Sequence, residues 1–249
     1  MKKLFLAWRD PKTGSWFPIG RLTFDGNRYQ FVYTHGVKEA KEQSAFEPLI
    51  SFPELNKVYE SNELFPIFTN RLLPPSRPDY QDFLDYLGVK GVEFDQLSLL
   101  SMSGGRRVTD SYEVFSLPKV DSEEKYHIPF FAHGLRHLAK ESIERINALE
   151  PGEQLLLLRD FQNPYDPSAL MLRTNDKFVG DRYFVGYCPR YLLKDVHRAL
   201  EHDANSIRVE VDQINLPAPL QLRLRCKMTA QWPAEAPPFA SNSFKPLVD

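Results

Sequence analysis

Residues 155–174 read LLLLRDFQNPYDPSALMLRT, so two apolar runs flank a polar and aromatic stretch. The runs Leu155–Arg159 and Ala169–Thr174 have the length and composition of short β-strands. Two further runs of this kind follow at Phe184–Tyr187 and Ile207–Val211, and the segment between them, Tyr191–His202, has the pattern of a helix. The segment therefore belongs to a part of the chain that is built on short strands.

Later and earlier residues extend this pattern. Leu220, Leu222, Leu224, Cys226 and Met228 alternate with polar or basic residues, which predicts one strand with an apolar face and a basic face. Upstream, Gly134–Leu149 has apolar residues mostly at helical spacing, and Pro151-Gly152 ends that pattern. Residues 126–232 are thus expected to form a small β-barrel with accessory helices.

The first part of the chain has a different pattern. Lys3–Trp8, Trp16–Leu22 and Arg28–Tyr33 predict short strands separated by turn residues. A helix is expected over residues 80–87, with Asp79 as its N-cap and Gly88 at its end, leaning on that sheet through Phe83, Leu84 and Leu87. We expect residues 1–120 to form an α+β module, an antiparallel sheet with a helix.

Two polar segments mark the limits of these parts. The acidic stretch Asp121–Glu124 follows Leu117-Pro118, where a regular element should end. After Trp232, residues 233–249 are rich in proline and small residues, which indicates a tail that either docks through Phe239 or Phe244 or is not ordered at all.

The composition excludes several classes of protein. The chain has 249 residues, of which 42% are hydrophobic and 26% charged, and a net charge of -2, so it does not coat nucleic acid by bulk charge. No apolar run approaches the roughly 18 residues of a membrane span. The apolar segment at Leu4–Trp8 is cut short by Arg9, Asp10 and Pro11, which argues against a signal peptide and for a cytoplasmic protein. The two cysteines, Cys188 and Cys226, form no metal-binding or disulfide pattern.

The stretch between the two apolar runs is the strongest candidate for a binding site. Pro164 and Pro167 stiffen it, so that Asn163, Tyr165 and Asp166 would be presented with little freedom to lose on binding. A tyrosine ring can stack on a base or sugar, and a carboxylate can accept a hydrogen bond from a free hydroxyl. The alternative is a rigid turn whose tyrosine packs down on the barrel.

Two motifs in this part of the chain resemble the HIRAN domain. They are Arg159-Asp160-x-x-Asn163-Pro164-Tyr165-Asp166-x-x-Ala169-Leu170 and Val185-Gly186-Tyr187-x-Pro189-Arg190, and the similarity covers about residues 126–230. The resemblance implies binding of single-stranded DNA, with capture of a 3′ end as in the helicase-like factors. It would place Asn163, Tyr165 and Asp166 at the terminal hydroxyl and sugar, with Tyr187 nearby and Arg190 near a phosphate.

The segment at residues 129–134 departs from the family, because the helicase-like proteins have an Arg-Tyr-Tyr cluster there. Phe131 could still stack on a base, but a cation is missing at this place. Contacts to phosphate would then come from other basic residues, namely Arg159, Arg190, Lys194, Arg223, Arg225 and Lys227. The alternative for the last three is a strand face that is merely solvated.

Residues 3–118 resemble the N-terminal subdomain of HipA-type toxin kinases. The similar segments include Gly20-Arg21-Leu22, Phe31-Val32-Tyr33, residues 65–74 and residues 94–100 with Gly104-Gly105. The kinase core of that family is missing, and the chain has neither its catalytic aspartate motif nor a nucleotide-binding loop. The resemblance implies a module that engages a protein partner, with a HipA-like kinase as one candidate.

Other chemistry is weakly indicated. His133, His137 and Glu141 would share one helix face as metal ligands, but no fourth ligand is evident and no metal or other cofactor is predicted. No nucleophile lies in a recognisable elbow, which favours binding over hydrolysis. We expect a non-catalytic adaptor. The rival hypotheses are an antitoxin-like regulator of a HipA-family kinase and the targeting subunit of a bacterial defence or repair complex.

Overall fold

The computed structural model describes residues 2–89, 94–107, 109–176, 178–233 and 235–248. The chain divides into two compact units. The first unit joins Met1–Leu117 to Pro238–Asp249, and the second unit is Pro118–Pro237. The acidic stretch at 121–124 lies inside the second unit, where it turns the chain between two strands, and the C-terminal segment belongs to the first unit.

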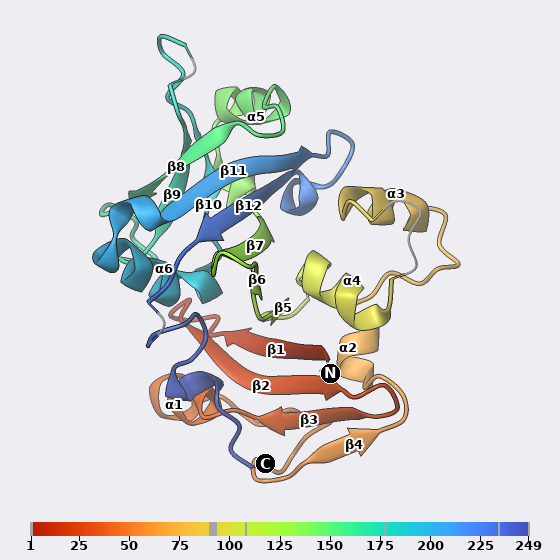
Figure 1. Ribbon diagram of the computed structural model, residues 1–249. Coiled ribbons are helices and arrows are strands. Elements are labelled where there is room, and N and C mark those ends of the chain that lie inside the picture. Colours follow the sequence, from red (N-terminus) through yellow and green to blue (C-terminus); the bar gives the residue numbers. More distant parts are fainter. Residues whose placement is uncertain (1, 90–93, 108, 177, 234, 249) are drawn as a thin grey trace. The chain divides into compact units, whose positions relative to one another are not determined.

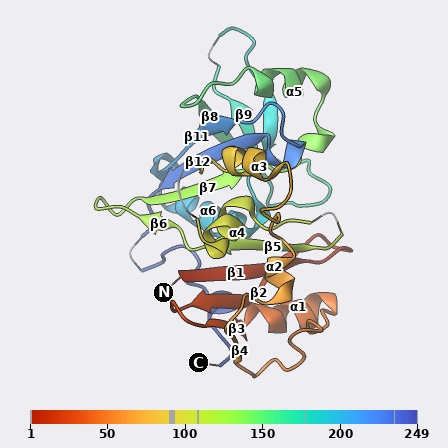
Figure 2. The same cartoon turned by 90° about the vertical axis from the view of Figure 1, so that its right-hand side faces the viewer.

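The first unit contains a five-stranded antiparallel sheet in the order β4-β3-β2-β1-β5, which Figure 2 shows from the side. Its strands are β1 (Lys2–Arg9), β2 (Trp16–Phe24), β3 (Tyr29–Tyr33), β4 (Tyr59–Ser61) and β5 (Tyr112–Ser116). The three N-terminal strands lie where short runs separated by turn residues predict them.

Both faces of β1 are covered, which explains its continuous apolar run. Leu4 and Leu6 point into the main core of this unit. Phe5 lies on the other face because side chains alternate along a strand. There it pairs in register with Phe115 and packs against Phe239 and Phe244 of the C-terminal segment, with ring centroids 5.2–6.4 Å apart.

The C-terminal segment is therefore a packed part of the first unit. Figure 1 shows it in dark blue beside α1 (Gly36–Ser44), with the short 3₁₀ helix η4 (Asn242–Phe244) facing that helix. The backbone NH of Leu247 donates to the carbonyl oxygen of Tyr33 at 2.8 Å. Thr34 and Pro246 form an isolated β-bridge. Aromatic packing and backbone pairing thus hold residues 238–248.

Three further helices complete the first unit: α2 (Pro66–Thr69), α3 (Tyr80–Tyr86) and α4 (Gln96–Ser103). Asp95 caps α4, since its carboxylate accepts hydrogen bonds from the backbone NH groups of Leu97 and Ser98. Asp79 precedes α3 as predicted, but its carboxylate pairs with Arg77 and caps nothing. No residue within α3 itself is buried, but Leu87, at its C-terminal end, is fully buried, and Phe83 and Leu84 are half-buried. The expectation that this helix leans on the sheet stays a prediction.

The second unit contains a seven-stranded antiparallel sheet in the order β10-β9-β8-β11-β12-β7-β6. The strands are β6 (Lys119–Val120), β7 (Tyr126–Phe131), β8 (Gln154–Arg159), β9 (Leu170–Thr174), β10 (Phe184–Tyr187), β11 (Ile207–Ile214) and β12 (Leu224–Ala230). Within the described residues the sheet does not close, so the expected barrel is corrected to an open antiparallel sheet.

One isolated bridge nevertheless links β10, at one end of this sheet, to the segment just after β7, next to the other end. The backbones of His133, just after β7, and Tyr187, in β10, exchange two hydrogen bonds of 2.9 Å. Gly186 permits this approach, because it adopts a φ of 137° and a Cβ at that position would lie 3.0 Å from the carbonyl oxygen of His133. This explains the glycine of the second motif.

The helical elements of the second unit are η1 (Leu135–His137), α5 (Lys140–Asn147), α6 (Arg190–His202), η2 (Ala204–Ser206) and η3 (Leu220–Leu222). The helix predicted over 134–149 is thus two elements, separated where Leu138 and Ala139 are extended. The strand predicted over 220–228 begins only at Leu224, because residues 220–222 form η3.

Buried groups anchor the second unit internally. The Arg145 guanidinium of α5 donates to the buried Asp181 carboxylate at 2.8 Å and to Glu153 at 2.8 Å, and these bonds raise the pKa of Arg145. Cys188 and Cys226 are free thiols whose pKa values are raised by burial.

Of the helices in the described ranges, none is both long enough and apolar enough to traverse a bilayer.

Candidate nucleic-acid interface

The connection between β8 and β9, residues 160–169, is here called the β8–β9 loop. The side-chain oxygen of Asn163 accepts hydrogen bonds from the backbone NH groups of Tyr165 at 3.0 Å and Asp166 at 3.1 Å. Asp166 in turn accepts one from the NH of Ser168 at 3.0 Å. These are Asx-type turns, and they account for the asparagine and aspartate in front of each proline. The Asn163 amide therefore organises the loop from within.

Tyr165 projects from this loop into solvent with 78% of the residue exposed. The alternative in which its ring packs down on the sheet is therefore wrong. An exposed aromatic ring on a hydrogen-bonded loop can stack against a flat partner without first having to be ordered.

Asp166 and Arg190 form an ion pair at 2.9 Å. Their side chains are 16% and 21% exposed, so the pair is largely shielded but still reaches the surface. Arg190 also donates to the carbonyl oxygen of Tyr165 at 3.4 Å. Arg190 is the first residue of α6, directly after the proline that starts this helix. The residues assigned to a hydroxyl and to a phosphate thus contact each other beside Tyr165.

Tyr187 of β10 supports the loop through Asp160. The Tyr187 hydroxyl donates to the Asp160 carboxylate at 2.7 Å, and the same oxygen accepts from the Asn163 amide at 3.3 Å. Burial and the hydrogen bond to this carboxylate raise the pKa of Tyr187 to about 12. The hydroxyl of Tyr187 is therefore engaged in holding the loop.

Helix α6 fixes the other side of the loop, and Figure 1 shows both at the same end of the second unit. Besides Arg190, His197 contributes, because its Nε2 lies 2.8 Å from the carbonyl oxygen of Ser168. Lys194 is exposed between them on this helix. Arg159, at the end of β8, has a side chain 47% exposed and lies 3.7 Å from Glu201 of α6. Three cationic side chains, those of Arg159, Arg190 and Lys194, thus come from the segments that frame the loop.

Three predicted site residues do not join this group. Phe131 is only 8% exposed and lies opposite Arg225 of β12, so its ring cannot stack on a base in this conformation. Arg225 pairs with Asp212 at 2.5 Å. Arg223 donates to the carbonyl oxygen of Ala218 at 2.8 Å and to Asn147 at 2.9 Å. The two arginines thus have local partners.

The weak metal candidate finds no support. His133 precedes η1, His137 ends it and Glu141 lies on α5, so the three side chains do not share one helix. His137 instead accepts a hydrogen bond from Arg136 at 2.9 Å. Across the described ranges, no three His, Cys, Asp or Glu side chains cluster as metal ligands would.

The geometry thus combines an exposed ring, a carboxylate and several cations on one proline-braced loop and the helix beside it. Residues 125–233 match the HIRAN domain family. The match lies within the second unit, and a HIRAN domain suggests DNA binding. No support exists for the resemblance of residues 3–118 to HipA-type kinases, which stays a prediction.

Two solved structures are similar to part of the chain. A protein from Lactobacillus plantarum is 18% identical, with 43% of this chain and 96% of that one covered and a TM-score of 0.32. The HIRAN domain of human HLTF is 20% identical, with 47% of this chain and 85% of that one covered and a TM-score of 0.31. No curated protein matches the chain.

Two features of the HIRAN domain were missed in the sequence. Phe161 is 82% exposed on the β8–β9 loop, and His197 holds that loop from α6. The signal for Phe161 was present, since a second aromatic residue stands in a polar stretch between strands. The role of His197 had no local signal, because its partner Ser168 lies on another element.

Proposed function

We propose that the HIRAN domain binds single-stranded DNA and holds a free 3′ end at the β8–β9 loop. The observation that carries this proposal is the exposed ring of Tyr165 beside the Asp166–Arg190 ion pair. The ring offers a stacking surface for the terminal nucleotide. A carboxylate has lone pairs for more than two hydrogen bonds, so Asp166 can still accept one from a sugar hydroxyl.

The charges of the pair favour a hydroxyl over a phosphate at the strand end. A terminal 3′-phosphate would bring its negative charge next to Asp166, and like charges at short range repel. Arg190 and Lys194 on α6 would instead neutralise phosphates further along the strand, and Arg159 would add a third cation. A few such contacts give an affinity that falls as salt is raised.

The experiment measures fluorescence anisotropy with 5′-labelled oligonucleotides that end in a 3′-hydroxyl or a 3′-phosphate. We expect micromolar binding of the hydroxyl form and weaker binding of the phosphate form. Tyr165→Ala should weaken both by roughly 5- to 100-fold, the range of one lost stacking contact. Asp166→Asn should remove the preference between the two ends.

Phe178→Ala is the matched control. It removes a ring that is 55% exposed and lies 5.7 Å from the Arg145 guanidinium, on the β9–β10 loop, which Figure 1 shows at the opposite end of the second unit. This control should bind like the unaltered protein. Equal binding of both strand ends contradicts end recognition, and absence of any binding contradicts the DNA-binding function. An RNA strand of the same sequence tests whether the domain binds deoxyribose in preference to ribose.

For the whole chain, we propose a non-catalytic adaptor in which the first unit engages a protein partner. Support comes from the sequence resemblance of residues 3–118 to a module that precedes or restrains a kinase. Affinity capture with the full chain, with and without nuclease, tests this arrangement. A partner that stays bound after nuclease treatment supports it, and loss of every partner on nuclease treatment contradicts it.

A further inference from the structure

Phe161 and Tyr165 are two exposed aromatic side chains on the same loop. Their residues are 82% and 78% exposed, and Leu158, just before the loop, is 36% exposed. Within the described residues neither ring packs against another aromatic ring. Full burial of a phenylalanine is worth about 1.5–3 kcal/mol, so a ring held in water forgoes that stabilisation. The two rings are therefore exposed apolar groups on a polar loop.

The exposure of Phe161 is built into the backbone of the loop. Asp160 closes a turn around it, because its carboxylate accepts from the NH of Gln162 at 3.3 Å and its carbonyl oxygen accepts from the NH of Asn163 at 3.2 Å. The hydroxyl of Tyr187 holds the same carboxylate at 2.7 Å. The residues on both sides of Phe161 are thus tied down, and the ring is presented outward.

The two rings lie within reach of one short strand. Four residues of chain span at most about 14 Å, so one short strand is long enough to reach from Tyr165 to Phe161. Arg159 lies two residues before Phe161, and its exposed contact with Glu201, at 3.7 Å, is long enough to exchange easily for a phosphate. The ring of Phe161 could stack on a base while Arg159 contacts the phosphate of the same nucleotide.

We infer that Phe161 is a second stacking surface, which takes the base next to the terminal nucleotide on Tyr165. This inference rests on the proposed function and adds a residue and a minimum ligand to it: a single strand with at least two unpaired nucleotides. A phenylalanine ring has no hydrogen-bonding atom, so it accepts any base and confers no sequence preference.

The experiment is a double-mutant cycle between protein and DNA, read by anisotropy. The ligands are a hairpin duplex with a 3′ overhang of four thymidines and the same hairpin with an abasic site at the nucleotide next to the 3′ end. Phe161→Ala should weaken binding of the intact overhang by roughly 5- to 100-fold. With the abasic overhang, the same substitution should have no effect, because the base it would contact is absent.

Two variants test whether binding needs an aromatic ring or only apolar area. Phe161→Trp keeps an aromatic ring and should restore affinity, whereas Phe161→Leu keeps apolar area without a π face and should not. Circular dichroism should show equal melting for all variants, since the side chain is exposed.

The outcomes distinguish failure of this inference from failure of the proposed DNA-binding function. If the abasic overhang and Phe161→Ala weaken binding independently, Phe161 does not contact that base and the inference is wrong, while the proposed function stands. If the unaltered protein binds neither hairpin, the proposed function is wrong and the inference falls with it. Loss of a captured protein in Phe161→Ala, with unchanged DNA affinity, would assign the ring to a protein partner and also overturn the inference.

Discussion

The carboxylate of Asp166 and the guanidinium of Arg190 lie 2.9 Å apart, although one belongs to the β8–β9 loop and the other starts α6. The pair closes the loop onto the helix beside the exposed ring of Tyr165. It therefore has two roles in the proposed mechanism: it holds the loop, and it supplies an acceptor for the strand end and a cation for a phosphate further along the strand.

The energetic coupling of this pair can be measured. A double-mutant cycle with Asp166→Asn and Arg190→Gln should give a coupling of about 1–2 kcal/mol in the free energy of unfolding, between the values for exposed and fully buried pairs. Urea unfolding followed by tryptophan fluorescence provides the measurement. The exposed pair Lys140–Glu144 on α5 is the control and should give only about 0.3–0.5 kcal/mol. Zero coupling for Asp166–Arg190 would contradict its structural role.

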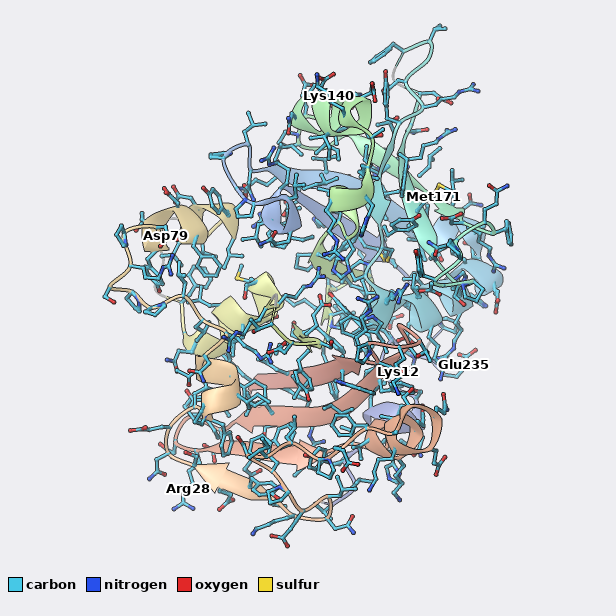
Figure 3. All side chains as sticks on the ribbon, turned by 180° about the vertical axis from the view of Figure 1, so that it is seen from behind. Lys12, Arg28, Asp79, Lys140, Met171 and Glu235 are labelled. Atoms are coloured by element: carbon cyan, nitrogen blue, oxygen red, sulfur yellow. The ribbon has the colours of Figure 1, made fainter. Side chains whose placement is uncertain are left out.

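The salt dependence of DNA binding should report the cations on α6. Each phosphate neutralised in a single strand contributes about -0.7 to the slope of log K against log salt. Lys194→Gln should therefore make the slope about 0.7 less steep. Lys140→Gln, at the α5 residue labelled in Figure 3, removes the same charge away from the loop and should leave the slope unchanged. Identical slopes for both variants would remove Lys194 from the interface.

Tyr187 should make stability depend on pH in the alkaline range. Its pKa is raised to about 12 in the folded protein from an ordinary value of 10. The unfolded chain loses this proton from pH 10 upward while the folded protein keeps it, so the stabilisation is complete below pH 10 and disappears as the pH rises to 12. The stability advantage over Tyr187→Phe should shrink across that interval. Urea unfolding at pH 8, 9, 10 and 11 checks this, and a constant difference would disagree with it.

Removal of residues 238–249 should destabilise the first unit. The deletion uncovers Phe5 and Phe115, which pack against Phe239 and Phe244. Phe239→Ala alone should cost about 3–5 kcal/mol, the usual range for a buried phenylalanine. Hydrogen exchange read by mass spectrometry should show lost protection in β1 and β5. Lys245→Ala, an exposed position in the same segment, should leave that protection intact.

Local pattern predicted many elements of this chain. Strands β1, β2, β3, β8, β9, β10 and β11 and helix α6 lie where apolar periodicity indicates them. The spacing of apolar residues was misleading at two places. The helical spacing over residues 134–149 includes Leu138 and Ala139, which are extended. The alternating run over residues 220–228 includes the 3₁₀ turn at residues 220–222. Hydrophobic periodicity indicates which side chains become buried, and a 3₁₀ turn can bury apolar residues that have the spacing of a helix or a strand.

In the candidate site, too, local features were predicted and contacts between distant segments were not. The motif predicted a stiff loop with Tyr165 at its tip, since prolines and Asx turns act within a few residues. The burial of Phe131 and the pairing of Arg225 with Asp212 could not be predicted. Both depend on which strands become neighbours, and strand order is not encoded by the period of a single strand.

Amino-acid order alone established the HIRAN-type motifs, the short strands and the rigid β8–β9 loop, because each arises from interactions between residues close in the chain. Tertiary structure alone brought Asp166 to Arg190, tied Ser168 to His197 and laid the C-terminal segment on Phe5. Those contacts join segments far apart in sequence, and they form only once the sheets have set the strand neighbours and buried the apolar faces that no local pattern can pair.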